Sequence, residues 1–305
     1  MCNFFKKIKE AIKSLFSAKE KPKEDKLPME VIEVVDNPED DNKDIEKYDD
    51  GGNYEVYPKD EEKLYYPKAI KTQEVLRTRG YYKKNYPQGA VVHFTAGRSR
   101  DKKQGGSKNA DSHLEMGKRS IRYAANKNSY CYFIIDRDGN VHQNFPLNRW
   151  GYHAGKSSWD GMEGSVSDEM VGIEVQCAGK LSEYYQNTSN GSEHKCPEGY
   201  LSSWFTRPES GDLFFNKEKE CRYSKDKLNI KEGWYHAFSE EQEESLIELI
   251  IWLKRNNPDI FQFKNVAGHD EVSPDRKNDP GASLSMTMSD LRKLLVDKYN
   301  LRYNL

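Results

Sequence analysis

The chain has 305 residues, a length that allows one large domain or two modest ones. Hydrophobic residues make up 35% of it and charged residues 32%, so its apolar share is below that of an ordinary globular domain. Such a shortfall rarely spreads evenly, and we expect a solvated segment beside a domain with a normal core. The net charge of -2 gives no support to a nucleic-acid partner, because binding to phosphates needs an excess of basic residues.

The chain begins with the pattern of a short amphipathic helix over residues 1–17. Apolar residues from Phe4 to Phe16 recur at helical spacing, and lysines occupy most of the remaining faces. Such a helix could dock on an anionic membrane surface or on a partner protein, or it could pack on its own domain, and periodicity favours none of these. It has no continuous apolar core, so we expect neither a Sec signal peptide nor a transmembrane segment.

Residues 18–63 are dense in Asp, Glu, Lys and Pro, with one short apolar patch from Val31 to Val35. A segment of this composition buries too little apolar surface to offset the entropy lost on ordering. We therefore predict a flexible, charged linker over residues 18–63 and a globular domain over residues 64–305.

Strand-like and helix-like segments alternate through the domain. The predicted strands are, in chain order, PQGAVVHFTAG, the hairpin YCYFIIDRDGNVHQNF, MVGIEVQC and FKNVAGHD. The predicted helices are residues 111–126, 239–254 and 289–299, and Ser239 with Gln242 forms a capping box at the start of the second. This alternation predicts an α/β fold, with a single mixed central sheet flanked by helices.

A polar stretch that carries many aromatic residues interrupts the domain over residues 179–236. It has no clear periodicity, and a connection this long within a compact domain is usually a lid, a binding loop or a small subdomain. We predict an insertion there, although its fold does not follow from the sequence.

Two histidines close apolar strands, where side chains from neighbouring strands can converge. His93 ends AVVHFTAG and His269 ends NVAGHD, and Asp279 follows ten residues after His269. Two imidazoles and a carboxylate are a common ligand set for Zn²⁺, with a fourth position left for water. Taken singly, a histidine at a strand end is more often structural, so the pattern alone does not decide between a metal site and buried core histidines.

Five motifs strengthen the metal hypothesis: VVHFTAG, IIDRDGNVHQ, GYHAG, VGIEV and AGHDEVSPDRKNDPG. In the same order they resemble the motifs of the zinc-dependent N-acetylmuramoyl-L-alanine amidases, over residues 87–295. That superfamily includes phage lysozyme-type amidases, cytosolic anhydro-muropeptide amidases and peptidoglycan-recognition proteins. Residues 1–63 lie outside the resemblance.

The resemblance implies a set of site residues. His93, His269 and Asp279 would be the zinc ligands, and Lys277 would stabilise the developing oxyanion. Glu174 in VGIEV matches an acidic residue that some members place near the metal, where a carboxylate can move the proton of the attacking water. The alternatives for Lys277 and Glu174 are an exposed loop lysine and a solvent-facing strand glutamate.

The same resemblance implies which residues line the substrate groove. Thr95, Trp150 and His153 match positions that line it. Some members carry a tyrosine on the first hairpin strand, and the aligned position here is Cys131, for which a small buried thiol is the simplest interpretation. His142, in the same hairpin, has no matching role and is expected at the surface.

The predicted activity is zinc-dependent hydrolysis of the amide between N-acetylmuramic acid and L-alanine, with peptidoglycan or muropeptides as the partner. The alternative is a peptidoglycan-binding module that has lost activity. Inactive members typically lack the last ligand, whereas Asp279 is present here, and this favours the enzyme. The N-terminal helix and linker, without a signal peptide, favour a phage lysin or a virion-associated enzyme that acts on the cell wall.

Overall fold

The computed structural model describes residues 61–71, 78–96, 114–115, 117–118, 120–121, 132–143, 145–187, 193–202, 214–216, 220–225 and 229–303. The predicted N-terminal helix and most of the predicted linker lie outside these residues. The first described element is the short helix α2 (Glu61–Leu64), which begins slightly before the predicted start of the domain. None of the helices in this described part is long and apolar enough to cross a membrane.

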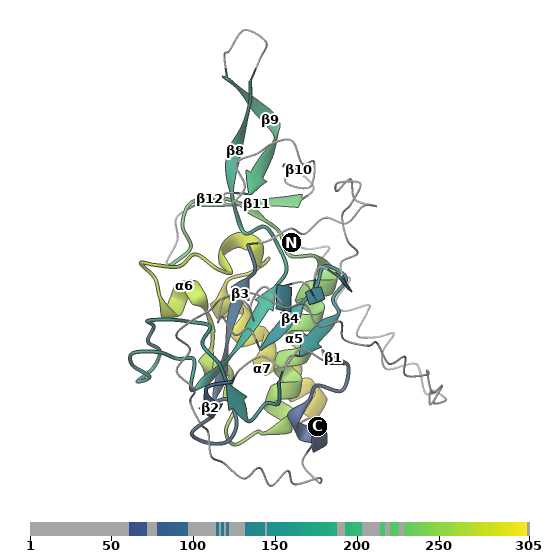
Figure 1. Cartoon of the computed structure of the whole chain (residues 1–305), viewed down its shortest axis with the longest axis vertical. Coiled ribbons are helices and arrows are strands. Elements are labelled where there is room, and N and C mark those ends of the chain that lie inside the picture. The colour runs from purple at the N-terminus through teal and green to yellow at the C-terminus, as the bar shows by residue number, and fades with distance from the viewer. Residues whose placement is uncertain are drawn as a thin grey trace, which may run out of the picture. The chain divides into compact units, whose positions relative to one another are not determined.

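The centre of the domain is a six-stranded mixed sheet (Figure 1), which confirms the predicted fold class. Its order is β1 (Ile70–Lys71), β5 (Val141–Gln143), β4 (Phe133–Ile135), β7 (Met170–Val175), β3 (Gly89–Phe94) and β13 (Val266–Gly268). Strand β3 is parallel to both of its neighbours, and only the hairpin pair β4 and β5 is antiparallel. The parallel strands β3 and β7 are almost completely buried, as expected for strands covered on both faces.

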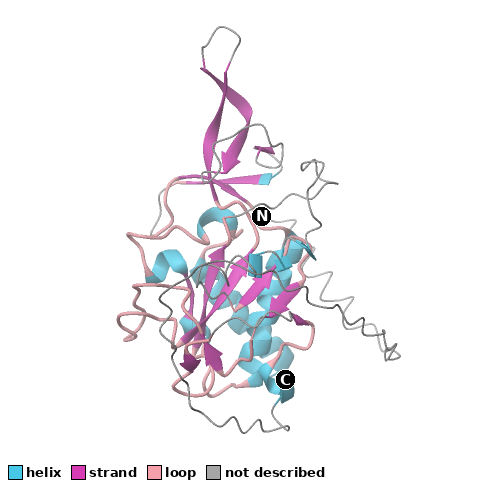
Figure 2. Ribbon diagram, in the orientation of Figure 1, coloured by secondary structure: helices cyan, strands magenta, loops and turns pink. Residues whose placement is uncertain are grey.

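Two long helices pack on this sheet (Figure 2). They are α5 (Glu240–Asn256) and α7 (Met288–Tyr303), close to the predicted 239–254 and 289–299. Shorter elements are α6 (His269–Val272), η3 (Phe263–Asn265) and η4 (Gly281–Ser283). The predicted helix over 111–126 is described only in part, and its described residues 114–115, 117–118 and 120–121 are helical.

The insertion folds as a second sheet, which the sequence did not predict. Its five antiparallel strands have the order β10 (Phe214–Asn216), β9 (Glu193–Ser202), β8 (Lys180–Asn187), β12 (Gly233–His236) and β11 (Cys221–Ser224). In Figure 1 the β8–β9 hairpin extends away from the central sheet. A two-stranded ribbon of β2 (Gly80–Tyr81) and β6 (Arg149–Trp150) completes the described strands.

The prediction that His142 lies at the surface is wrong. Its side chain is fully buried, and its Nε2 lies 3.1 Å from Oδ2 of Asp136, which is also fully buried. Asp136 further accepts hydrogen bonds from the backbone N–H groups of Asp138 and Asn140 at the hairpin turn. The His142 ring lies against Gly117, so a segment remote in sequence covers the face that the hairpin pattern left open.

Helix α5 is joined to the sheet by one buried amide. The predicted capping box is present: Gln242 N–H donates to Ser239 Oγ and the Gln242 side chain accepts from Ser239 N–H. The same side-chain amide donates to the carbonyl oxygens of Ile135 and Gln176, at the ends of β4 and β7, and accepts from Arg137. Gln242 therefore fixes the start of α5 against two strand ends.

Replacing this amide should destabilise the domain more than removing the cap alone. We expect Gln242→Ala to lower the free energy of unfolding by about 3 kcal/mol, because several buried polar groups lose their partner. Ser239→Ala, the matched control, should cost about 1 kcal/mol, as a lost N-cap does. Urea denaturation of both variants measures the difference, and equal losses would show that the strand-end contacts of Gln242 contribute nothing.

Candidate metal centre

The three predicted ligands converge at one end of the central sheet. His93 lies on β3, and His269 is the first residue of α6, directly after β13. Strands β3 and β13 are parallel, with Val92 opposite Gly268. The next residues, His93 and His269, therefore lie side by side. Asp279 joins them from the loop before η4.

Three ligand atoms of this cluster lie within hydrogen-bonding distance of one another. Nδ1 of His93 is 2.8 Å from Nδ1 of His269, and Oδ2 of Asp279 is 3.0 Å from the former and 2.9 Å from the latter. All three residues are buried, with exposed fractions of 2%, 3% and 7% for His93, His269 and Asp279. The described residues contain this one group of three potential ligands with atoms so close together.

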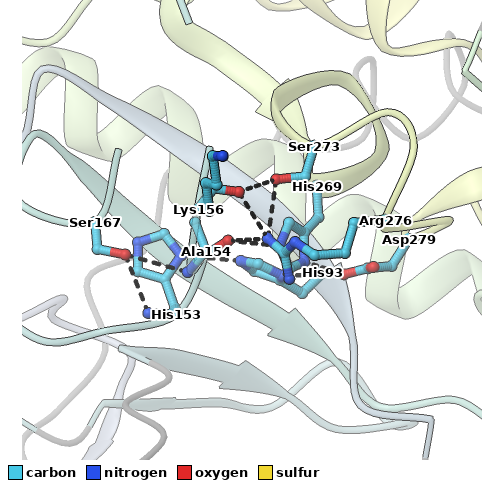
Figure 3. Close-up of polar contacts among 9 residues, drawn as sticks. All are labelled: His93, His153, Ala154, Lys156, Ser167, His269, Ser273, Arg276 and Asp279. Atoms are coloured by element: carbon cyan, nitrogen blue, oxygen red, sulfur yellow. Dashed lines mark hydrogen bonds and ion pairs between the residues drawn. The ribbon is translucent and has the colours of Figure 1, made fainter. Parts of the chain in front are cut away.

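The outer ring nitrogens define which tautomer each histidine adopts (Figure 3). His153 Nε2 lies 2.9 Å from the carbonyl oxygen of Met170, which can only accept, so His153 donates there and its Nδ1 carries a lone pair. That lone pair accepts from His93 Nε2, 3.0 Å away. His269 Nε2 likewise donates to the carbonyl oxygen of Ala154 over 3.1 Å. In the neutral form of each ligand histidine, Nδ1 is then unprotonated and faces the cluster.

This arrangement fits a metal ion. Two imidazole lone pairs and a carboxylate oxygen point at one another with no hydrogen atom between them, so their repulsion is relieved by a shared cation. Nitrogen and oxygen ligands in a three-residue set suit Zn²⁺. Burial, followed by the nearby His269, lowers the pKa of His93 to about 4, which keeps its imidazole in the neutral form that a metal needs.

Glu174 lies beside the cluster on the neighbouring strand. It pairs directly with His93 in the parallel register of β3 and β7, and Oε2 of its carboxyl is buried with no hydrogen-bond partner among the residues that the structure describes. Burial, and then the charge of Asp279, raises the pKa of Glu174 to about 8, while Lys277 opposes the shift. The charge of Lys277 acts on His93 as well, so the described residues bring together the cluster, an acid and a cation.

The three residues predicted to line a groove have separate surroundings. The Thr95 hydroxyl bonds with the backbone of Cys177, and the Trp150 ring packs edge-on against Tyr152 at 5.2 Å. His153 lies against the cluster, where both of its ring nitrogens are engaged. Substrate contact by Thr95, Trp150 and His153 therefore stays a prediction, and Cys131 lies outside the described residues.

Residues that the sequence did not single out complete the surroundings of the cluster. Ala154 offers its backbone carbonyl to His269, and the guanidinium of Arg276 donates to the same oxygen. Ser167 accepts from the backbone N–H groups of His153 and Ala154. Only the motif GYHAG, which holds His153 and Ala154, marked this loop in the sequence; a contact made by a backbone carbonyl leaves no residue type to recognise.

Comparison with known proteins assigns the family. The family model described as N-acetylmuramoyl-L-alanine amidase matches residues 83–282. The chain belongs to this family. The match begins before β3 and ends within η4, so it includes every residue of the cluster together with Glu174 and Lys277.

Several solved structures resemble this amidase-family chain. The selenomethionine derivative of AmpD has a TM-score of 0.41 and 18% identity, and the match covers 75% of this chain and 96% of AmpD. The endolysin amidase LysCS from Clostridium intestinale URNW has a TM-score of 0.39 and 16% identity, with 76% and 98% covered. PGRP-SA from Apis mellifera has a TM-score of 0.38 and 15% identity, with 71% and 91% covered. Identities this low transfer neither substrate nor catalytic residues, and no curated protein sequence matches the chain.

The raised pKa of Glu174 gives a pH test on metal-free protein. Between its usual pKa of 4.5 and about 8, the folded carboxyl keeps its proton while the unfolded one is ionised, so the folded state loses stability as pH rises. Glu174→Gln removes this loss, and its stability relative to wild type should increase from pH 5 to pH 8. Urea denaturation of both proteins between pH 5 and pH 8, with a chelator present, measures this difference in stability. Glu240→Gln, at the exposed start of α5, is the control, and parallel curves for wild type and Glu174→Gln would contradict the shift.

Proposed function

We propose that this chain is a zinc-dependent peptidoglycan hydrolase that cleaves the amide between the lactyl group of N-acetylmuramic acid and L-alanine. The observation that carries the proposal is the convergence of His93, His269 and Asp279, with unprotonated atoms directed at one another beside Glu174 and Lys277. Membership of the amidase family supports the substrate class.

His93, His269 and Asp279 would hold the ion. A bound zinc ion would supply a Lewis acid for the amide carbonyl and lower the pKa of water. The protein contributes two neutral imidazoles and one carboxylate, so the ligand set as a whole carries a single negative charge. The dication is thus only partly neutralised, which favours Lewis-acid behaviour over a purely structural role.

Glu174 would carry the proton through the reaction. A carboxylate at this position takes a proton from the attacking water as its oxygen bonds to the amide carbon, and returns it to the nitrogen as the C–N bond breaks. The products are the lactyl carboxylate and the free amine of L-alanine. Burial raises the pKa of Glu174 in metal-free protein and a bound dication would lower it again, so the group could accept and release a proton near neutral pH.

Lys277 would stabilise the negative charge that grows on the carbonyl oxygen. Its charge acts on both Glu174 and His93, so it lies within electrostatic range of the centre where the amide would react. A cation in a partly buried site lowers the barrier more than one in bulk water, since little solvent screens it.

The insertion sheet would set the range of substrates. Its β12 strand packs against η4, which directly follows the loop that carries Asp279, and the Tyr235 ring fits against Gly281 there. Thr95, Trp150 and His153 are proposed to line the groove. The N-terminal region, with its amphipathic pattern, supports a phage lysin or virion-associated enzyme, and phage genes beside the coding gene would be expected.

The proposal is tested by digestion of purified peptidoglycan with wild type and Asp279→Ala. We expect wild type to release L-alanine amino termini without new reducing sugar, and to contain one equivalent of zinc. Asp279→Ala should lose both the zinc and the activity, because two imidazoles alone bind the ion poorly. Zinc without cleavage would favour a binding module, and a wild type that binds no zinc would refute the metal site.

Separate substitutions distinguish the roles of Glu174 and Lys277 from metal binding. Glu174→Gln should keep its zinc and lower kcat by roughly 10²- to 10⁴-fold, the usual contribution of a general base. Lys277→Met should also keep its zinc and lower kcat by about 100-fold, as loss of an oxyanion donor does. Lys264→Met is the control, because the Lys264 side chain is the exposed one on η3 and pairs with Asp160. Full activity in either test variant would remove that residue from the mechanism.

A further inference from the structure

Two consecutive residues of one loop hold the outer nitrogens of both ligand histidines. The imidazole of His153 accepts from His93 Nε2, and the backbone carbonyl of Ala154 accepts from His269 Nε2 (Figure 3). The two ligands come from different elements, β3 and α6, yet a single turn of chain sets the orientation of both rings. Any shift of this turn therefore moves both Nδ1 atoms at once.

One end of the turn is fixed against strand β7. The His153 ring donates to the Met170 carbonyl, and it packs so closely on Gly172 that a Cβ there would lie 2.7 Å from its Cγ. The buried hydroxyl of Ser167 accepts from the backbone N–H of His153 at 3.2 Å and of Ala154 at 3.1 Å. These contacts fix the backbone on the N-terminal side of the turn.

The other end is fixed by Arg276. Its Nη2 donates to the Ala154 carbonyl, and also to the carbonyl of Lys156 at 3.0 Å and to Ser273 Oγ at 2.9 Å. Ser273 Oγ in turn donates to the Lys156 carbonyl at 2.8 Å. Arg276 belongs to the segment between His269 and Asp279, so it joins the turn to the part of the chain that supplies two of the ligands.

We infer that Arg276 and Ser167 are positioning residues for the metal centre, which act through the 153–154 turn on the tautomer and orientation of His93 and His269. Hydrogen-bond partners of ligand histidines raise ligand basicity and lock the ring, and their loss typically lowers metal affinity 10- to 100-fold. The Ala154 carbonyl oxygen uses its two lone pairs for His269 and Arg276, so removing the guanidinium frees the carbonyl to rotate away from His269. The inference rests on the proposed metal site and is independent of the substrate.

The test measures zinc affinity by competition with a chromophoric chelator, using the full chain. Arg276→Met should bind zinc at least about 10-fold more weakly than wild type, and Arg276→Lys, which keeps one donor for the Ala154 carbonyl, should recover part of the affinity. Arg302→Met is the matched control, because it removes a partly exposed arginine that pairs with Glu248 of α5 instead. It should bind zinc as wild type does.

A merely structural role is excluded by two further measurements. The melting temperatures of metal-free Arg276→Met and Arg302→Met should fall by similar amounts, while only the former loses affinity. In metal-free protein, NMR of the imidazole groups should show His93 and His269 both protonated on Nε2 in wild type, and a mixture of tautomers for His269 in Arg276→Met.

Ser167→Ala is a second variant, in case Arg276→Met does not fold. It removes the acceptor for two consecutive N–H groups and should also weaken zinc binding. Wild-type affinity in both Ser167→Ala and folded Arg276→Met would overturn the inference while leaving the metal site intact. A wild type without zinc affinity would instead refute the proposed function, so the two failures are distinguishable.

Discussion

The parallel register of β3 with its two neighbours is the constraint on which the centre depends. Pairing with β7 places Glu174 opposite His93, and pairing with β13 places the first residue of α6 beside it. A slip of one residue in either pairing would turn these side chains to the other face of the sheet. The two faces of β3 pack into different clusters, with Val92 in the larger core and Val91 against Ala154 and Ala267, so a slip would disrupt the packing on both faces.

Two strands at the centre could be predicted from sequence, because each is a short apolar run with one polar residue just before its end. His93 and Glu174 lie on such strands, and the α5 cap follows a local rule that tertiary contacts do not override. His269 differs slightly: it begins a helix and does not end a strand. That detail depends on the backbone turn after Gly268, which periodicity alone does not define.

The parts that could not be predicted depend on contacts between remote segments. His142 occupies a hairpin position that a local pattern assigns to solvent, and only its burial beside Asp136 and Gly117 makes it a core residue. The Ala154 carbonyl and the Arg276 guanidinium meet across more than a hundred residues of sequence. In the insertion, β8 pairs with β12 from the far end of the same segment, a contact that no local pattern marks.

The insertion also leaves and rejoins the domain at a single point. The backbone N–H of His236 donates to the Gly179 carbonyl at 2.9 Å, and Nδ1 of His236 accepts from the Ala178 N–H at 3.1 Å. Chain ends already bonded to each other can be bridged by segments of very different length, since closure entropy grows only with the logarithm of loop length. Evolution or an engineer can therefore replace the module between Gly179 and His236 at this junction while the strands around the candidate metal centre keep their register.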